Sequence, residues 1–155
     1  MKLTNFGTAL KFAMHREDQT IEIYEGTTRN LKNIEVRDIL LSLAMAGKKR
    51  RAALERLYRE NMYSDMDTGI FEPIAGLNVS EYIIEVKRSY KVKYPDILKL
   101  AIEIEDKTEK FYHELANRLK VRRSGIARDL LKMNQENLDD RLKLKHLEES
   151  MILAQ

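Results

Sequence analysis

The sequence contains no cysteine among its 155 residues. Disulfide bonds, cysteine-ligated zinc and thiol catalysis are therefore excluded. It also has no run of 18 apolar residues, so no segment is expected to span a bilayer as a helix, and we expect no membrane partner. Charges at Lys11 and from His15 to Asp18 interrupt any secretory hydrophobic region near the N-terminus. Together these absences predict a cytoplasmic protein.

An excess of charge of one sign is also missing. Lys and Arg total 28 and Asp and Glu total 25, which gives a net charge of +3, and the mean hydropathy is −0.50. The one basic run, residues 48–51 (Lys-Lys-Arg-Arg), would spread around a helix, and no aromatic residues are interleaved with a basic stripe elsewhere. We therefore expect a solvated helix face here and no nucleic-acid partner.

One stretch of the sequence occurs twice. Residues 98–120 align with residues 10–32 at an offset of 88, and nine of the 23 aligned positions are identical. Apolar residues recur at steps of three and four in both copies, which predicts two amphipathic helices. A single carboxylate interrupts the apolar stripe at the same position in each copy, Glu17 in the first and Glu105 in the second. The repeat predicts that both carboxylates face the core.

The periodicity predicts four long helices in a single domain over residues 1–155. The first helix pair spans residues 5–62 and the second spans residues 95–153. Between them the helical pattern lapses over residues 63–94, where Gly69, Pro73 and Gly76 break it. We expect this segment to be a long crossover that joins the two pairs.

The second and fourth helices carry matching polar interruptions in their seams. At an offset of 90, the apolar seam of residues 36–57 aligns with that of residues 126–147. Gly47 aligns with Asn137, and Arg50 aligns with Asp140. A glycine in a helix costs about 1 kcal/mol relative to alanine, and an inward-facing arginine needs a partner. The second half of the chain is thus a fainter repeat of the first, as in a duplicated helix hairpin.

These features resemble the rubrerythrin branch of the ferritin-like superfamily, over nearly the whole chain. The resemblance implies an all-α, ferritin-like four-helix bundle built from a duplicated helix hairpin with one long crossover. In that family, helices one and three each give one glutamate to a di-iron centre, and helices two and four each give a Glu-x-x-His pair. Glu17 and Glu105 match the two single glutamates.

The Glu-x-x-His pairs are absent from this sequence. Gly47 and Arg50 occupy the positions of the glutamate and histidine in helix two, and Asn137 and Asp140 occupy those positions in helix four. A shift of two residues in the fourth helix would place Gln135 and Leu138 there instead, which also leaves no Glu-x-x-His. Two of six expected ligands remain, or three if Asp140 binds. We therefore expect no cofactor.

Arg50 is our candidate for the counter-charge that replaces the metal, bridging Glu17, Glu105 and, as a further candidate, Asp140. Three carboxylates against one arginine would leave one carboxyl protonated or facing water. The sequence then predicts a degenerate, metal-free structural or binding module. The alternative is a di-iron carboxylate oxidoreductase, or another iron-binding protein, with non-standard ligands drawn from Glu17, Glu105 and Asp140. In that case Glu22, Glu109 or Glu136 would shift inward.

Several remaining residues receive simpler predictions. Tyr24 and Tyr112 lie seven residues after the two glutamates, and we expect core packing with each hydroxyl bonded to a carboxylate or water. The three histidines have no ligand spacing and are expected on helix surfaces. The segment 65–69 is similar to the opening of a calcium loop but lacks the closing glutamate, so we expect no calcium site. We expect a homodimer, with a candidate surface on the apolar crossover residues Ile70, Phe71, Ile74, Ile83 and Ile84.

Overall fold

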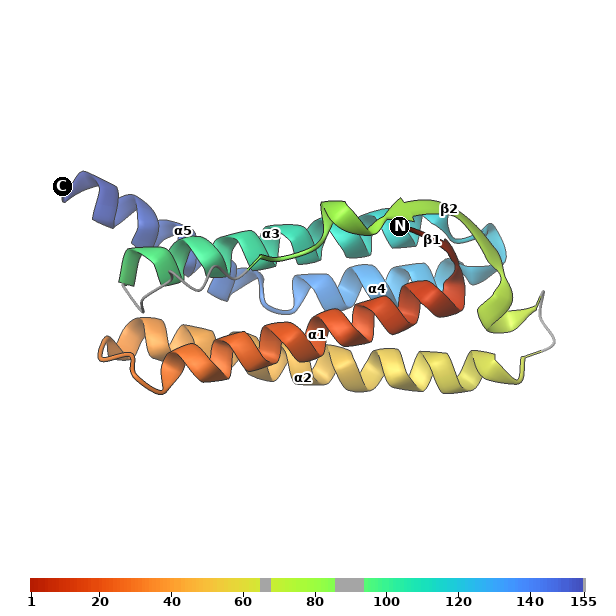
Figure 1. Cartoon of the computed structure of the whole chain (residues 1–155), viewed down its shortest axis with the longest axis horizontal. Helices are drawn as coiled ribbons and strands as arrows, with labels where there is room; N and C mark the ends of the chain where they lie inside the picture. Colours follow the sequence, from red (N-terminus) through yellow and green to blue (C-terminus); the bar gives the residue numbers. More distant parts are fainter. Residues whose placement is uncertain (65–67, 86–93, 155) are drawn as a thin grey trace.

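The computed structural model describes residues 1–64, 68–85 and 94–154 of the chain. The described part is mostly helical, as predicted (Figure 1). Its long helices are α1 (Phe6–Thr28), α2 (Ile34–Met62), α3 (Tyr94–Arg118), α4 (Ser124–Gln135) and α5 (Leu138–Leu153). None of the helices in these residues is long and apolar enough to cross a membrane.

The first helix pair forms as the sequence predicts. Asn5 caps α1, since its side chain accepts a hydrogen bond from the backbone N–H of Thr8 at 2.8 Å. Asn33 caps α2 in the same way, through the N–H of Val36 at 3.2 Å. The two helices lie side by side along most of their length (Figure 1). All the predicted seam residues of α2 from Val36 to Leu54 are buried.

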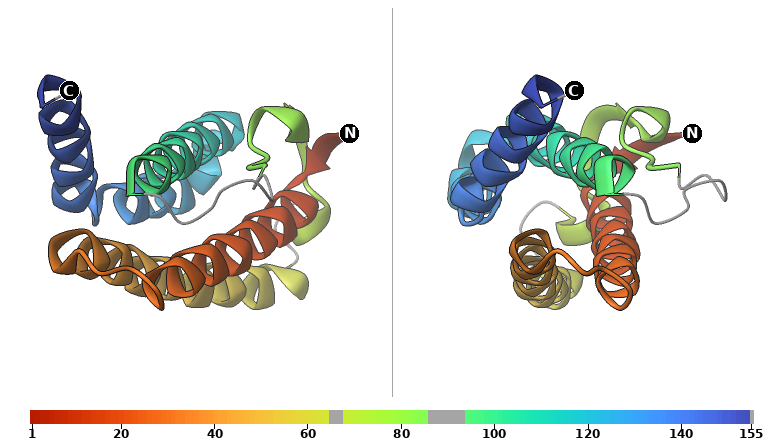
Figure 2. Two further views of the ribbon diagram at one scale, coloured as in Figure 1. Left: turned by 60° about the vertical axis from the view of Figure 1, so that its left-hand side comes forward. Right: turned by 90° about the vertical axis from the view of Figure 1, so that its left-hand side faces the viewer.

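The fourth predicted helix is not continuous, which corrects the sequence prediction. It is divided into α4 and α5 at Glu136 and Asn137. The two segments run in different directions, and the last turns of α5 project away from the other helices (Figure 2). Asn137 lies at this break with its side chain buried in the core. The helical periodicity of the sequence continues across the break, so the periodicity did not predict that the helix is divided.

The crossover contains structure that the sequence analysis did not predict. Strand β1 (Lys2–Asn5) pairs antiparallel with strand β2 (Pro73–Asn78), with Leu3 opposite Leu77. Two short 3₁₀ turns, η1 (Gly69–Phe71) and η2 (Val79–Glu81), flank β2. The Asn78 side chain accepts from the N–H of Ser80 at 3.2 Å. Asn78 therefore caps the single 3₁₀ turn η2.

Most of the crossover's apolar residues belong to the chain's own core. Ile70, Ile74 and Ile84 are buried, and only Phe71 and Ile83 of the five candidate interface residues are exposed. The predicted dimer surface on this segment is therefore wrong for the three buried residues. Residues 65–67 of the calcium-like fragment lie outside the described residues.

A buried ion pair joins the crossover to the residue that precedes α4. Glu72 accepts a hydrogen bond from Arg123 Nε, and both side chains are buried. Arg123 also donates to the side chain of Asn61 at 2.7 Å, and its guanidinium lies 5.3 Å from the ring centroid of Phe6. The backbone N–H of Phe6 donates to the carbonyl of Glu72 at 2.9 Å. One charge pair thus connects α1, α2, the crossover and the second helix pair.

Gly47 permits the close approach of α1 and α2. A Cβ atom at this position would lie 3.0 Å from Cγ1 of Ile21 and 3.3 Å from Oε2 of Glu17. Both distances are tighter than ordinary van der Waals contact. The glycine therefore has a packing role.

We expect Gly47→Ala to lower the free energy of unfolding by about 1 kcal/mol. Overpacking of a tight core costs about 1–3 kcal/mol, which outweighs the gain of about 1 kcal/mol in helix propensity. Gly26→Ala is the matched control, because Gly26 lies in α1 with nothing within 4 Å of its added Cβ. We expect that variant to be unchanged or more stable in urea denaturation. Equal stabilisation by both substitutions would contradict the packing role.

Candidate functional site

The centre of the bundle holds a buried ion pair between α1 and α2. Arg50 Nε donates to Glu17 Oε1 at 2.8 Å, and Arg50 Nη2 donates to Glu17 Oε2 at 3.2 Å. Both side chains are only 2% exposed. This two-bond geometry suits the planar guanidinium fork, which a lysine could not reproduce. The prediction that Arg50 turns inward against Glu17 is confirmed.

The second repeat glutamate has neutral partners instead of an arginine. Glu105 accepts hydrogen bonds from the Tyr24 hydroxyl, at 2.8 Å, and from the side-chain amide of Asn137. Glu105 is buried on α3. Arg50 therefore does not bridge the two glutamates by hydrogen bonds, which corrects that part of the prediction. The contact with Asn137 agrees with the helix-four register that places Asn137, rather than Gln135, at the site.

The two tyrosines connect the helix pairs reciprocally. Tyr112 of α3 donates to Glu17 of α1 at 2.7 Å, while Tyr24 of α1 donates to Glu105 of α3. Burial, followed by the charge of the adjacent glutamate, raises the pKa of both phenols well above its ordinary value. Both hydroxyls therefore remain protonated donors. The expectation that each would bond a carboxylate is confirmed.

Arg16 is a second buried cation that the sequence analysis missed. It donates to the backbone carbonyl of Tyr82 at 3.1 Å and to that of Ile104 at 3.1 Å, and to the Thr108 hydroxyl at 2.5 Å. Burial lowers the pKa of its guanidinium, and the charge of Glu17 partly offsets this. The signal was present in the sequence, because Arg16 lies three residues after Ala13 on the buried face of α1.

The charges of the centre therefore balance. Arg16 and Arg50 supply two cations, and Glu17 and Glu105 supply two anions, all of them buried. Asp140 lies outside this group, since it is half-buried and accepts a hydrogen bond from the Ser42 hydroxyl at 2.5 Å. The predicted excess of three carboxylates over one arginine is wrong, because Asp140 points elsewhere and Arg16 points in.

The pKa values of the charged groups reflect burial and partner charges together. Burial raises the pKa of Glu105 above its ordinary value, while the charge of Arg50 and the hydrogen bond from Tyr24 partly oppose the shift. Burial alone would lower the pKa of Arg50, but the negative charges around it, led by Glu17, raise the pKa overall. Arg50 is thus a permanent cation at the centre.

These residues do not fit an iron centre. Both oxygens of Glu17 are bonded to Arg50, and both oxygens of Glu105 accept hydrogen bonds from neutral donors. A fixed cation beside the carboxylates would repel a metal ion. Within residues 1–64, 68–85 and 94–154, no three His, Asp or Glu side chains lie close enough together to hold one.

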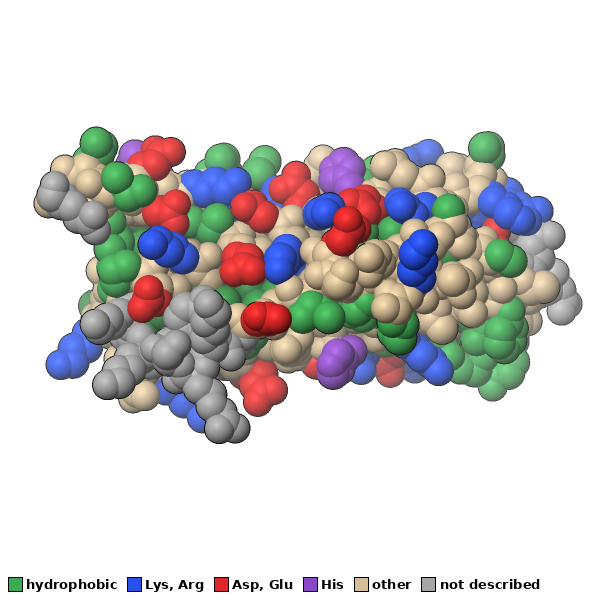
Figure 3. Space-filling view, turned by 45° about the horizontal axis from the view of Figure 1, so that its top comes forward, with side chains coloured by type: hydrophobic (Ala, Val, Ile, Leu, Met, Phe, Trp, Pro, Cys, Tyr) green, Lys and Arg blue, Asp and Glu red, His purple; other side chains and the backbone are tan. Residues whose placement is uncertain are grey.

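The other charged candidates lie on the surface. Glu22 and Glu136 are exposed, Glu109 is half-buried and pairs with Arg141 at 3.2 Å, and all three histidines are exposed. In the basic run, Lys48 pairs with Glu25 at 2.6 Å and Arg51 pairs with Asp18 at 3.1 Å. Positive and negative side chains are intermixed on the face seen in Figure 3. The run therefore lies as predicted, distributed around its helix.

Comparison with protein-family models, with curated proteins and with solved structures finds no match for this chain.

We expect Arg50→Met to lower the free energy of unfolding by about 3–5 kcal/mol, because it leaves the Glu17 carboxylate buried without its charge partner. Arg51→Met, in the next position of the same helix, removes two ion pairs of a half-buried arginine with the exposed residues Asp18 and Glu55. It should cost only about 1 kcal/mol. Denaturant unfolding monitored by circular dichroism measures both. Equal losses of unfolding free energy in the two variants would contradict the prediction that the buried pair contributes more to stability than the exposed contacts.

Stability should also depend on pH through Glu105. Because the pKa of Glu105 is higher in the folded than in the unfolded chain, the folded state holds this proton more tightly. Its stabilising contribution is present below the unfolded pKa and is lost as the pH rises through the folded pKa. The difference in unfolding free energy between wild type and Glu105→Gln should therefore fall as the pH rises above 4.5. The exposed neighbour variant Asp106→Asn is the control, and a difference that grows with pH would contradict the prediction.

Proposed function

We propose that this chain is a ferritin-like four-helix bundle of the rubrerythrin type in which an arginine replaces the di-iron centre. On this proposal it is a cytoplasmic homodimer that acts as a structural or binding module, without redox chemistry, nucleic acid or membrane partner. The observation that carries the proposal is the buried two-bond pair between Arg50 and Glu17. The charge that metal ions would supply to the repeat glutamates is supplied here by guanidinium groups.

The internal repeat supports the ferritin-like part of the proposal. Glu17 and Glu105 occupy equivalent positions on α1 and α3, and both side chains turn to the centre. Arg50 and Asn137 approach them from α2 and from the start of α5. Four helical segments therefore direct polar groups to one level of the bundle, which is where bundle proteins of this kind build their sites.

The absence of spare ligands supports the metal-free part. An iron ion would have to displace Arg50 from Glu17, and Tyr24 and Asn137 from Glu105. The displaced Arg50 side chain would then either remain beside the iron ion as a second positive charge or move out of the core. Both outcomes are unfavourable by several kcal/mol, given the cost of separating a buried pair.

The direct test is metal analysis of protein purified without chelator and then incubated with ferrous iron in air. We expect far less than one iron per chain and no near-ultraviolet absorption of oxo-bridged ferric iron. The melting temperature should also be unchanged by iron, because a metal that bound the folded state would raise it. Two irons per chain with peroxide turnover would instead establish the alternative, a di-iron carboxylate oxidoreductase with non-standard ligands.

A further inference from the structure

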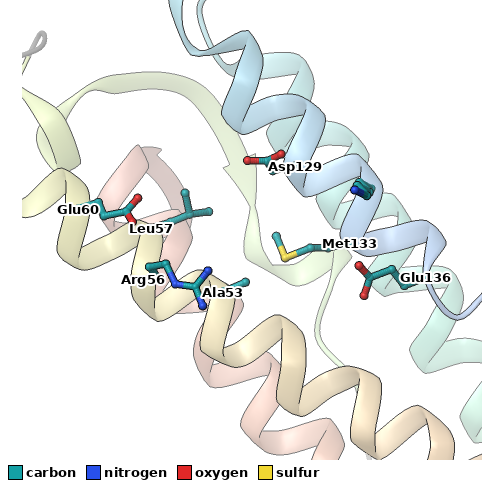
Figure 4. A pocket seen from close by; sticks show the side chains of 8 residues that line it. Ala53, Arg56, Leu57, Glu60, Asp129, Met133 and Glu136 are labelled. Carbon is teal, nitrogen blue, oxygen red and sulfur yellow. The ribbon is translucent and has the colours of Figure 1, made fainter.

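A trough runs along the bundle between α2 and α4. Helix α2 packs on α1 and on α5 but makes little close contact with α4, and two adjoining cavities of about 390 and 400 Å³ lie between them. Both cavities share Leu57, Glu60 and Asp129 as lining residues, so they form one continuous trough (Figure 4).

The floor of the trough is apolar and its rims are charged. Leu57 from α2 and Met133 from α4 point into the space between the helices (Figure 4) and are half-buried. The rims carry Arg56, Glu60, Asp129, Lys132 and Glu136, which are all exposed. Within the described residues, none of these five charged side chains forms an ion pair, although Lys48 and Arg51 of α2 do. The trough therefore has an apolar floor, and its rims carry solvent-exposed charges of both signs.

Helix α5 carries an exposed stripe of matching character, in which Lys145 forms an exposed ion pair with Asp106 of α3 at 3.3 Å. The outer stripe of α5 steps by four, three, four and three residues through Leu138, Leu142, Lys145, Glu149 and Ile152. Its apolar members are 44%, 56% and 60% exposed, and the adjacent Leu153 is 86% exposed. Helix α5 turns away from the line of α4 (Figure 2). The stripe is exposed, although Ile152 also lines a cavity beside Pro95 and Leu98 of α3.

The charges of the two surfaces match in spacing. Along α2, Arg56 and Glu60 are one helical turn apart, and along the outer stripe Lys145 and Glu149 are also one turn apart. A helix laid antiparallel to α2 would bring Lys145 between Glu60 and Asp129, where it would exchange its exposed pair with Asp106 for these two carboxylates. The same register would bring Glu149 between Arg56 and Lys132, with Ile152 over Ala53 and Met133.

We propose that a second copy of this chain inserts the outer stripe of its α5 into the trough between α2 and α4. A two-fold arrangement would make the contact twice and cover both exposed apolar surfaces on each chain. This inference rests on the homodimer proposed above and specifies its interface. It assigns that interface to the trough instead of the crossover, most of whose apolar residues are buried within the chain.

Charge reversal tests the register. Sedimentation velocity over a concentration series should give a dimer for the wild type. Glu149→Lys should raise the dimer dissociation constant by at least about tenfold, because it sets like charges against Arg56 and Lys132. Adding Arg56→Glu in the same chain should recover much of the affinity. Lys48→Glu is the control and should leave the constant unchanged, because Lys48 pairs with Glu25 and so lies on the side of α2 that faces α1.

The outcomes separate the interface from the dimer. A wild-type monomer at all concentrations would overturn both this inference and the proposed homodimer. A dimer insensitive to Glu149→Lys would overturn this inference alone and leave the dimer standing. Circular dichroism of each variant establishes that the substitutions leave the helices folded.

Cysteine cross-linking provides an independent test, since the natural chain has no cysteine. Chains carrying Arg56→Cys are mixed with chains carrying Glu149→Cys under mild oxidation. We expect a disulfide-linked dimer that contains one chain of each kind. Replacing Arg56→Cys by Lys48→Cys, on the side of α2 that faces α1, should abolish this product. Equal yields from the two mixtures would overturn the proposal.

Discussion

The buried pair of Arg50 and Glu17 is the constraint around which the rest of the core is arranged. Two charges removed from water lose several kcal/mol of hydration each, and they recover it only through close geometry and further hydrogen bonds. The pair meets this condition with two charge-assisted bonds and a third from Tyr112. Each of these partners comes from a different helix, so the ion pair can form only when α1, α2 and α3 are correctly placed.

The same requirement explains why α2 and α4 can separate. In the arrangement that the sequence resembles, ligands on helices two and four would bind the same metal centre and hold these helices together. Here Arg50 turns to α1 and Asn137 turns to α3, so each polar contact lies within its own half of the bundle. No charge pair among the described residues links α2 to α4, and the trough lies between them. The tyrosines are among the polar contacts that join the two helix pairs, together with those of Arg16 to α3 and of Ser42 to Asp140.

Much of this core could be predicted from sequence, because periodicity and repetition report which face a residue occupies. The repeat fixed the inward phase of Glu17 and Glu105, and the seam of α2 placed Arg50 beside them. Arg16 was missed because a stripe is judged by its apolar members, although its spacing from Ala13 put it on the buried face. The strand pair of Leu3 and Leu77 depends on contacts between segments more than 70 residues apart in the sequence, and short strands leave little local pattern.

The two helix pairs stabilise their buried glutamates differently, and the difference explains the charge balance. In the first half, position 50 supplies a cation, so Glu17 can remain ionised as a pair. In the second half the corresponding residue, Asp140, is an acid; had it turned inward, a third carboxylate would have stood beside Glu105. Instead the helix breaks just before it, so that the neutral amide of Asn137 reaches Glu105 and Asp140 lies against Ser42. The second cation comes from Arg16, whose hydrogen bonds go to backbone carbonyls and a hydroxyl. The carboxylates therefore act on Arg16 through space, Glu17 more strongly than Glu105. Neutrality of the core is thus reached by two arginines from the first half, while the second half contributes the helix break and, with it, the exposed face of α5.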